Sequence, residues 1–171
     1  MTGSGMTPRR ILAVVGPGDG AALEEIAAAE RIAELAARAG WIVSCGGRNS
    51  GVMAAAARGA ARGGGVSIGI LPSSDSSDAA PELTVALATG LGEARDAVVA
   101  SSGEVLVACG MSAGTAAEVA LAIKAGKPVV LIRPDRTSRE FFRGLGADRV
   151  RIAASADEAL AYISAPFPWP P

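Results

Sequence analysis

The sequence contains no histidine, few aromatic residues and no hydrophobic run of the about 18 residues needed to cross a bilayer. Histidine is the most common general base and metal ligand. Its absence argues against a zinc site and leaves carboxylates, arginine, hydroxyls or bound water for any chemistry. Aromatic residues make up only 4%, so the core has to be built from Ala, Val, Ile and Leu. The net charge of -1 offers no basic surface, so we expect neither nucleic acid nor a membrane as partner.

Only two cysteines are present, Cys45 and Cys109, and both fall at predicted strand ends. Together with the lack of a secretion signal, they favour a reduced cytoplasmic protein without a disulfide. The length of 171 residues suits one domain. We expect that domain to span residues 10–164, after a disordered leader (1–9) and before a proline-rich tail (165–171).

Short apolar runs alternate with segments of helical periodicity along the whole chain. Strands are predicted at 10–15, 41–45, 66–71, 82–88, 105–108, 128–132 and 149–153, and helices at 21–39, 52–62, 93–101, 115–125, 137–145 and 155–163. This alternation predicts an α/β fold of three layers, in which a Rossmann-like, doubly wound and mainly parallel sheet of about 6–7 strands carries helices on both faces. Ligands bind such sheets where the crossover direction reverses, here at the carboxyl ends of strands 10–15 and 105–108.

Four glycine-containing turns, beginning at Gly16, Gly46, Gly90 and Gly110, follow strands and are expected to meet near that edge. A helix that begins after such a turn points free N–H groups and a partial positive charge at the crevice. The sequence therefore predicts an anion site. The turn at 16–20 lacks G-x-G-x-x-G spacing, so a dinucleotide is not indicated. Whether this turn touches a ligand phosphate or only reverses the chain stays open.

Two charged residues near these turns each allow a structural interpretation. The spacing of Thr115 and Glu118 matches a capping box, in which the carboxylate bonds the backbone of its own helix. Spacing alone favours that interpretation over a carboxylate that faces a ligand. Arg95 fits either a surface ion pair with Glu93 or Asp96 or a contact with phosphate.

Three of the turns, taken together, resemble the signatures of the LOG-like (SLOG) Rossmann superfamily, whose members were once mislabelled lysine decarboxylases. These segments are residues 46–53 (GGRNSGVM), 89–95 (TGLGEAR) and 114–118 (GTAAE). The resemblance covers about residues 10–132. Through the segments GEARDAVV and IGILP it is closer to the branch that includes molybdenum cofactor carrier proteins.

The resemblance also implies roles for individual residues. Arg95 corresponds to the catalytic or phosphate-side arginine of the superfamily, and Glu118 to the carboxylate that closes its P-G-G-x-G-T-x-x-E motif. Here that motif reads GMSAGTAAE, so Met111 and Ser112 stand in place of both glycines after the missing proline. Side chains at these positions favour binding over turnover, because they lie where backbone would have to approach a phosphate.

The resemblance implies a carrier or binding protein for a phosphorylated heterocycle, such as a nucleotide or the pyranopterin of the molybdenum cofactor. No cofactor is required, and the molybdenum cofactor would be a carried ligand. The alternative is a phosphoribohydrolase that releases base and ribose 5-phosphate from nucleoside 5'-monophosphates, with Arg95 and Glu118 as catalytic residues. A third hypothesis is a scaffold protein whose pocket is empty. Candidate ligand-binding residues are Gly16, Gly46, Gly47, Arg48, Asn49, Gly90, Arg95, Gly110, Met111, Ser112, Ala113, Gly114, Thr115 and Glu118.

Apolar faces on the alanine-rich helices, together with the resemblance, further predict a homo-oligomer, a dimer or larger.

Overall fold

A computed structural model describes residues 9–169 and contains one seven-stranded sheet in the order β4-β3-β2-β1-β5-β6-β7. All neighbouring strands pair in parallel. The strands are β1 (Ile11–Val15), β2 (Ile42–Cys45), β3 (Ser67–Leu71), β4 (Val85–Ala88), β5 (Val105–Cys109), β6 (Val129–Ile132) and β7 (Val150–Ala153). The predicted fold class is confirmed. The predicted leader lies outside the described residues except for Arg9.

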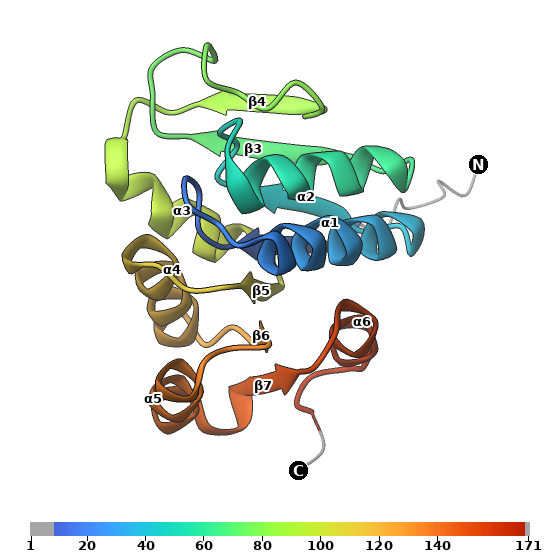
Figure 1. The fold of residues 1–171 in the computed structure, drawn as a ribbon, viewed down its shortest axis with the longest axis vertical. Coiled ribbons are helices and arrows are strands. Elements are labelled where there is room, and N and C mark those ends of the chain that lie inside the picture. The colour runs from blue at the N-terminus through green and yellow to red at the C-terminus, as the bar shows by residue number, and fades with distance from the viewer. Residues whose placement is uncertain (1–8, 170–171) are drawn as a thin grey trace, which may run out of the picture.

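Helices cover both faces of the sheet (Figure 1). They are α1 (Leu23–Arg38), α2 (Gly51–Arg62), α3 (Arg95–Ser102), α4 (Ala113–Lys124), α5 (Arg136–Gly146) and α6 (Ala156–Ser164). Short 3-10 helices at Gly92–Ala94 and Ala147–Arg149 lead into α3 and β7. Helices α1, α2 and α6 pack on one face, and α3, α4 and α5 pack on the other.

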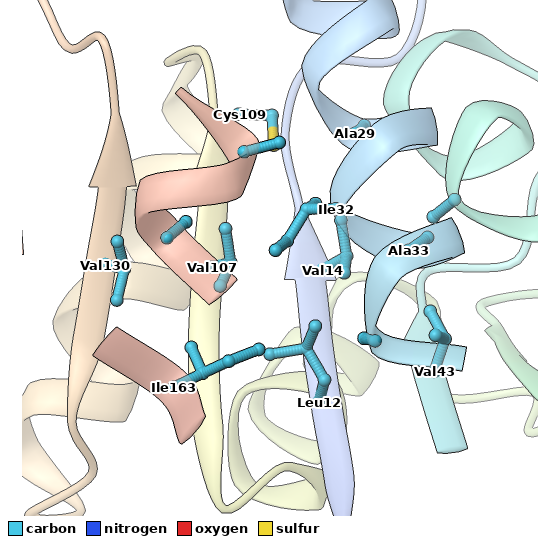
Figure 2. Close-up of a cluster of buried hydrophobic side chains, with 14 of the residues drawn as sticks. Leu12, Val14, Ala29, Ile32, Ala33, Val43, Val107, Cys109, Val130 and Ile163 are labelled. Carbon is cyan, nitrogen blue, oxygen red and sulfur yellow. The ribbon is translucent and has the colours of Figure 1, made fainter. Parts of the chain in front are cut away.

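The central strand β1 is buried on both faces, because alternate side chains along a strand point to opposite sides. Leu12 and Val14 belong to the core under α1, α2 and α6, in which Ile32 and Ile163 are the largest helix side chains (Figure 2). Ala13 and Val15 face the second core under α3, α4 and α5. Continuous apolar runs in the sequence therefore correspond to strands that contact helices on both sides.

The crossover direction reverses between β1 and β5. Strand β1 pairs with β2 on one side and with β5 on the other, so the chain builds the sheet outward in both directions from this pair. Crossovers are right-handed, which places the helices after β1 and β2 on one face and those after β5 and β6 on the other. A crevice at the carboxyl ends of β1 and β5 follows from this topology.

The alanine-rich faces of α1 and α2 pack against each other inside the protomer. Their buried alanines are Ala29, Ala33, Ala36, Ala37, Ala54, Ala55, Ala56, Ala57 and Ala60. Gly59 brings the two backbones close together, because a Cβ there would overlap the carbonyl of Glu30. These faces are therefore not free for the predicted subunit contact. Large apolar side chains are exposed instead at several other places. They are Val85 and Leu87 on β4, Leu91 and Val98 before and on α3, Phe141 and Leu145 on α5, Leu23 at the start of α1, and Phe167.

The tail packs against α6 as far as it is described. The Trp169 indole is buried, and its Nε1 donates a hydrogen bond to the Tyr162 carbonyl over 2.9 Å. Along residues 9–169, no helix has the length and apolar character that a membrane span requires.

Candidate ligand-binding site

A cavity of about 200 Å³ lies at the carboxyl ends of β1, β2 and β5. Small-molecule pockets usually begin at about 300 Å³, so this cavity suits one part of a ligand and leaves the remainder outside. Its lining comes from the turns after these strands and from α2, α3 and α4. The lining residues are Val15, Gly16, Gly18, Asp19, Gly46, Arg48, Met53, Glu93, Arg95, Asp96, Ser112, Gly114, Thr115 and Glu118.

Helix α4 begins at the cavity and is capped by Ser112. The Ser112 Oγ accepts a hydrogen bond from the Thr115 N–H over 3.2 Å and shares a second bond with the Thr115 hydroxyl over 2.9 Å. Thr115 therefore lies inside the first turn and is not the cap residue. The capping-box interpretation of Thr115 and Glu118 is wrong, because Ser112 starts the helix earlier than the spacing suggested. Among described residues, the N–H groups of Ala113 and Gly114 have no acceptor.

Arg95 is buried beside the cavity, with 8% of its surface exposed. Its Nη1 lies 3.4 Å from the Asp96 carboxylate and 3.9 Å from that of Glu118. Its Nε is buried without a hydrogen-bond partner among residues 9–169. The Asp96 pair that the sequence allowed is therefore present, but it belongs to the cavity wall and not to an open surface.

The backbone at Gly46 lies directly against the Arg95 guanidinium. A Cβ at this position would overlap Arg95 Nη1 and the sulfur of Met53. Only a residue without a side chain lets β2 end here while Arg95 keeps its place. The turn at Gly46 therefore positions the arginine.

Glu118 faces the cavity from the second turn of α4, and 6% of its surface is exposed. Burial raises its pKa to about 8, and the negative charge of Asp96 adds to the increase. The Arg95 charge acts in the opposite direction without cancelling it. Burial also raises the pKa of Asp96, again against the effect of Arg95. The Glu118 carboxyl therefore keeps its proton at neutral pH.

Residues 9–160 match the SLOG cluster4 family. The chain belongs to this family. The predicted superfamily is thereby confirmed. The molybdenum cofactor binding protein of Rippkaea orientalis is 39% identical, with a TM-score of 0.90 over 92% of this chain and 96% of that one. The Moco carrier protein of Chlamydomonas reinhardtii is 42% identical, with a TM-score of 0.87 over 92% and 96%. An uncharacterized protein of Archaeoglobus fulgidus is 36% identical over 111 residues, which are 62% of this chain and 69% of that protein.

In this SLOG cluster4 protein, the turn after β2 is tied to the loop 72–81. Arg48 Nε pairs with the Asp78 carboxylate over 3.2 Å, and the Asn49 N–H donates to the Asp78 carbonyl over 2.8 Å. The Gly47 carbonyl accepts a bond of 2.9 Å from the Ala80 N–H. The loop 72–81 is thus hydrogen-bonded to this turn and borders the Arg48 side of the cavity.

Eight of the predicted site residues line the cavity: Gly16, Gly46, Arg48, Arg95, Ser112, Gly114, Thr115 and Glu118. Six others, Gly47, Asn49, Gly90, Gly110, Met111 and Ala113, do not. Gly110 borders a separate hollow of about 240 Å³, where its left-handed backbone (φ 87°) lies against the Glu25 side chain. Met111 packs against the core beneath α3 and α4.

Sequence reasoning missed Val15, Gly18, Asp19, Met53, Glu93 and Asp96 as lining residues. Glu93 and Asp96 lie within two residues of Arg95 in the chain. The segment that indicated Arg95 could therefore also have indicated these two acids. Among described residues, no cluster of three or more His, Cys, Asp or Glu could hold a metal ion. Both cysteines are free and buried, and burial raises the pKa of Cys45 to about 11, so its thiol stays protonated.

Proposed function

We propose that this chain binds a phosphorylated heterocycle, and specifically the pyranopterin of the molybdenum cofactor, as a carrier or binding protein. The observation that carries this proposal is the similarity over almost the whole chain to the two molybdenum cofactor proteins, at 39% and 42% identity. A cavity at the switch point of the sheet supports it, because this is where doubly wound folds bind ligands.

The amino end of α4 suits the phosphate of such a ligand. Two backbone N–H groups, those of Ala113 and Gly114, lack acceptors among described residues, and the Thr115 hydroxyl lies beside them. Helix N-termini bind phosphate through such N–H groups and the partial positive charge of the helix. Arg95 would add a charge-assisted hydrogen bond to the heterocycle of the ligand. The cofactor is cargo in this proposal and takes no part in folding the site.

Loading with the molybdenum cofactor tests the proposal. Under oxygen-free conditions, cofactor released from a molybdoenzyme would be mixed with the protein. Unbound cofactor would then be removed by gel filtration. We expect molybdenum, measured by plasma mass spectrometry, and pterin, measured by fluorescence after oxidation, to elute with the protein in equal amounts. Arg95→Ala should lose most of this load, whereas Arg139→Ala, which removes an exposed arginine outside the cavity, should retain it. Elution of both away from the wild-type protein would contradict a carrier role.

The protonated state of Glu118 supports a second candidate function, hydrolysis of nucleoside 5'-monophosphates. A carboxyl with a pKa of about 8 can give its proton to a departing base. While it is protonated, the same carboxyl cannot stabilise the positive charge that develops on the ribose. Protonation of the base and stabilisation of that charge would therefore need different groups. Release of ribose 5-phosphate from a panel of nucleoside monophosphates, which Glu118→Gln abolishes, would establish an enzyme. No release from any member would exclude turnover of these substrates.

A further inference from the structure

The cavity wall contains more carboxylates than a phosphate site would need. Four acidic side chains line it, Asp19, Glu93, Asp96 and Glu118, against the two arginines Arg48 and Arg95. The Glu118 carboxyl keeps its proton at neutral pH and does not repel an anion. An ionised carboxylate in the wall, such as that of Asp96, does repel phosphate. The acidic part of the wall must therefore face another portion of the ligand, one that presents hydrogen-bond donors.

Most of these charged groups already have partners. Asp19 accepts a hydrogen bond of 2.6 Å from the Ser50 hydroxyl, and Arg48 pairs with Asp78. Glu93 is exposed at the rim. Asp96 differs, because only 14% of its side chain is exposed and Arg95 is the one cation near it among described residues.

The Asp96 carboxylate therefore has unused acceptor capacity, since an ionised carboxylate accepts about four hydrogen bonds. Leaving a largely buried anion with so few donors is costly, and a ligand with N–H groups would satisfy it. The neighbouring Arg95 guanidinium, 3.4 Å away, is a donor. The wall thus offers two adjacent acceptors followed by a donor.

We propose that Asp96 and Arg95 recognise the 2-amino-4-oxopyrimidine edge that pterins and guanine share. The Asp96 carboxylate accepts from the ring N–H and the exocyclic amino group, and Arg95 donates to the adjacent carbonyl. Asp96 is the specificity-determining residue in this arrangement. The inference rests on the proposed function and names the side chains that would recognise the heterocycle of its ligand.

Adenine does not match this arrangement. Its corresponding edge has a ring-nitrogen lone pair where guanine and pterin have an N–H. That lone pair would face the Asp96 carboxylate, and the carbonyl that Arg95 needs is missing. Hypoxanthine keeps the N–H and the carbonyl but lacks the amino group, so it should rank between guanine and adenine.

Isothermal titration with GMP, IMP, AMP and ribose 5-phosphate tests the proposal on the wild-type protein. We expect GMP to bind about 10-fold to 100-fold more tightly than IMP, because IMP lacks one charge-assisted hydrogen bond. AMP should bind no better than ribose 5-phosphate. Asp96→Asn should remove the difference between GMP and IMP. Asp148→Asn, which removes an equal charge at an exposed position outside the cavity, should preserve it.

Two results would overturn this inference. Equal affinities for GMP, IMP and AMP would show that the base edge is not read, while binding of phosphorylated ligands, and with it the proposed function, would stand. Failure of all three nucleotides to bind would also refute recognition of this edge. Loading with the molybdenum cofactor then decides the proposed function separately, because it does not use nucleotides.

Discussion

Replacing Glu118 with glutamine should remove a cost of folding that grows with pH. The pKa of this carboxyl is about 8 in the folded protein against 4.5 for a free glutamate. Between these values the folded state binds more protons than the unfolded state, so the free energy of unfolding falls as pH rises through this window. For a typical ion-paired carboxylate, the free energy of unfolding rises with pH. It falls here because burial outweighs the attraction of Arg95.

The size of the effect follows from the two pKa values. Each unit of difference contributes about 1.4 kcal/mol, so the wild-type protein should lose about 3 to 4 kcal/mol between about pH 5 and about pH 8 through this one group. Glu118→Gln has the same shape and does not titrate. Its stability should therefore lack this decrease, and the variant should exceed the wild type at about pH 8 or above.

Urea denaturation followed by circular dichroism, repeated across this pH range, measures the difference between the two proteins. The quantity of interest is the gap between their free energies of unfolding, since other titrating groups are common to both and cancel. Glu82→Gln removes an exposed carboxylate outside the cavity and should run parallel to the wild type. If the Glu118→Gln curve also ran parallel, the buried and uncompensated state of Glu118 would be refuted.

Three further expectations concern the same framework. Gly46→Ala should lower the free energy of unfolding by about 1–3 kcal/mol and weaken ligand binding, because its Cβ would collide with Arg95. Gly144→Ala has open space around the new Cβ, so urea titrations should show a free energy of unfolding that is higher by up to about 1 kcal/mol. Ser112→Ala should lower stability by about 1 kcal/mol through loss of the α4 cap; an unchanged melting curve would contradict this. Light scattering should show a dimer or larger assembly that Leu87→Asp on exposed β4 dissociates, and a monomeric wild type would end this prediction.

The order of strands and helices followed from patterns that act over a few residues. Apolar runs such as 105–108 and 128–132 could only be strands buried on both faces, and glycines marked the turns between elements. Right-handed crossovers then left few ways to arrange the sheet. The switch point between β1 and β5, and with it the place of the cavity, could therefore be predicted without coordinates.

Local patterns were less informative where two neighbouring residue types could perform the same task. Thr115 and Ser112 are both suitable caps. Which of them caps α4 depends on how soon after the end of β5 the helix begins. The alanines of α1 and α2 looked like a subunit interface because sequence shows an apolar face but not what covers it. In the fold they are covered by each other and by the sheet, and Ala54 and Ala57 are covered by Ala80.

The sequence by itself determined the α/β architecture, the turns that gather at one edge of the sheet and the SLOG resemblance, because each depends on short-range order. Tertiary structure alone decided that Gly110 turns toward α1 and away from the cavity, and that Asp96 enters it beside Arg95. It also decided that Glu118 is buried without enough positive charge to keep it ionised at neutral pH. The burial of a side chain and the charges around it depend on segments that are distant in sequence. Only the packing of those segments determines them.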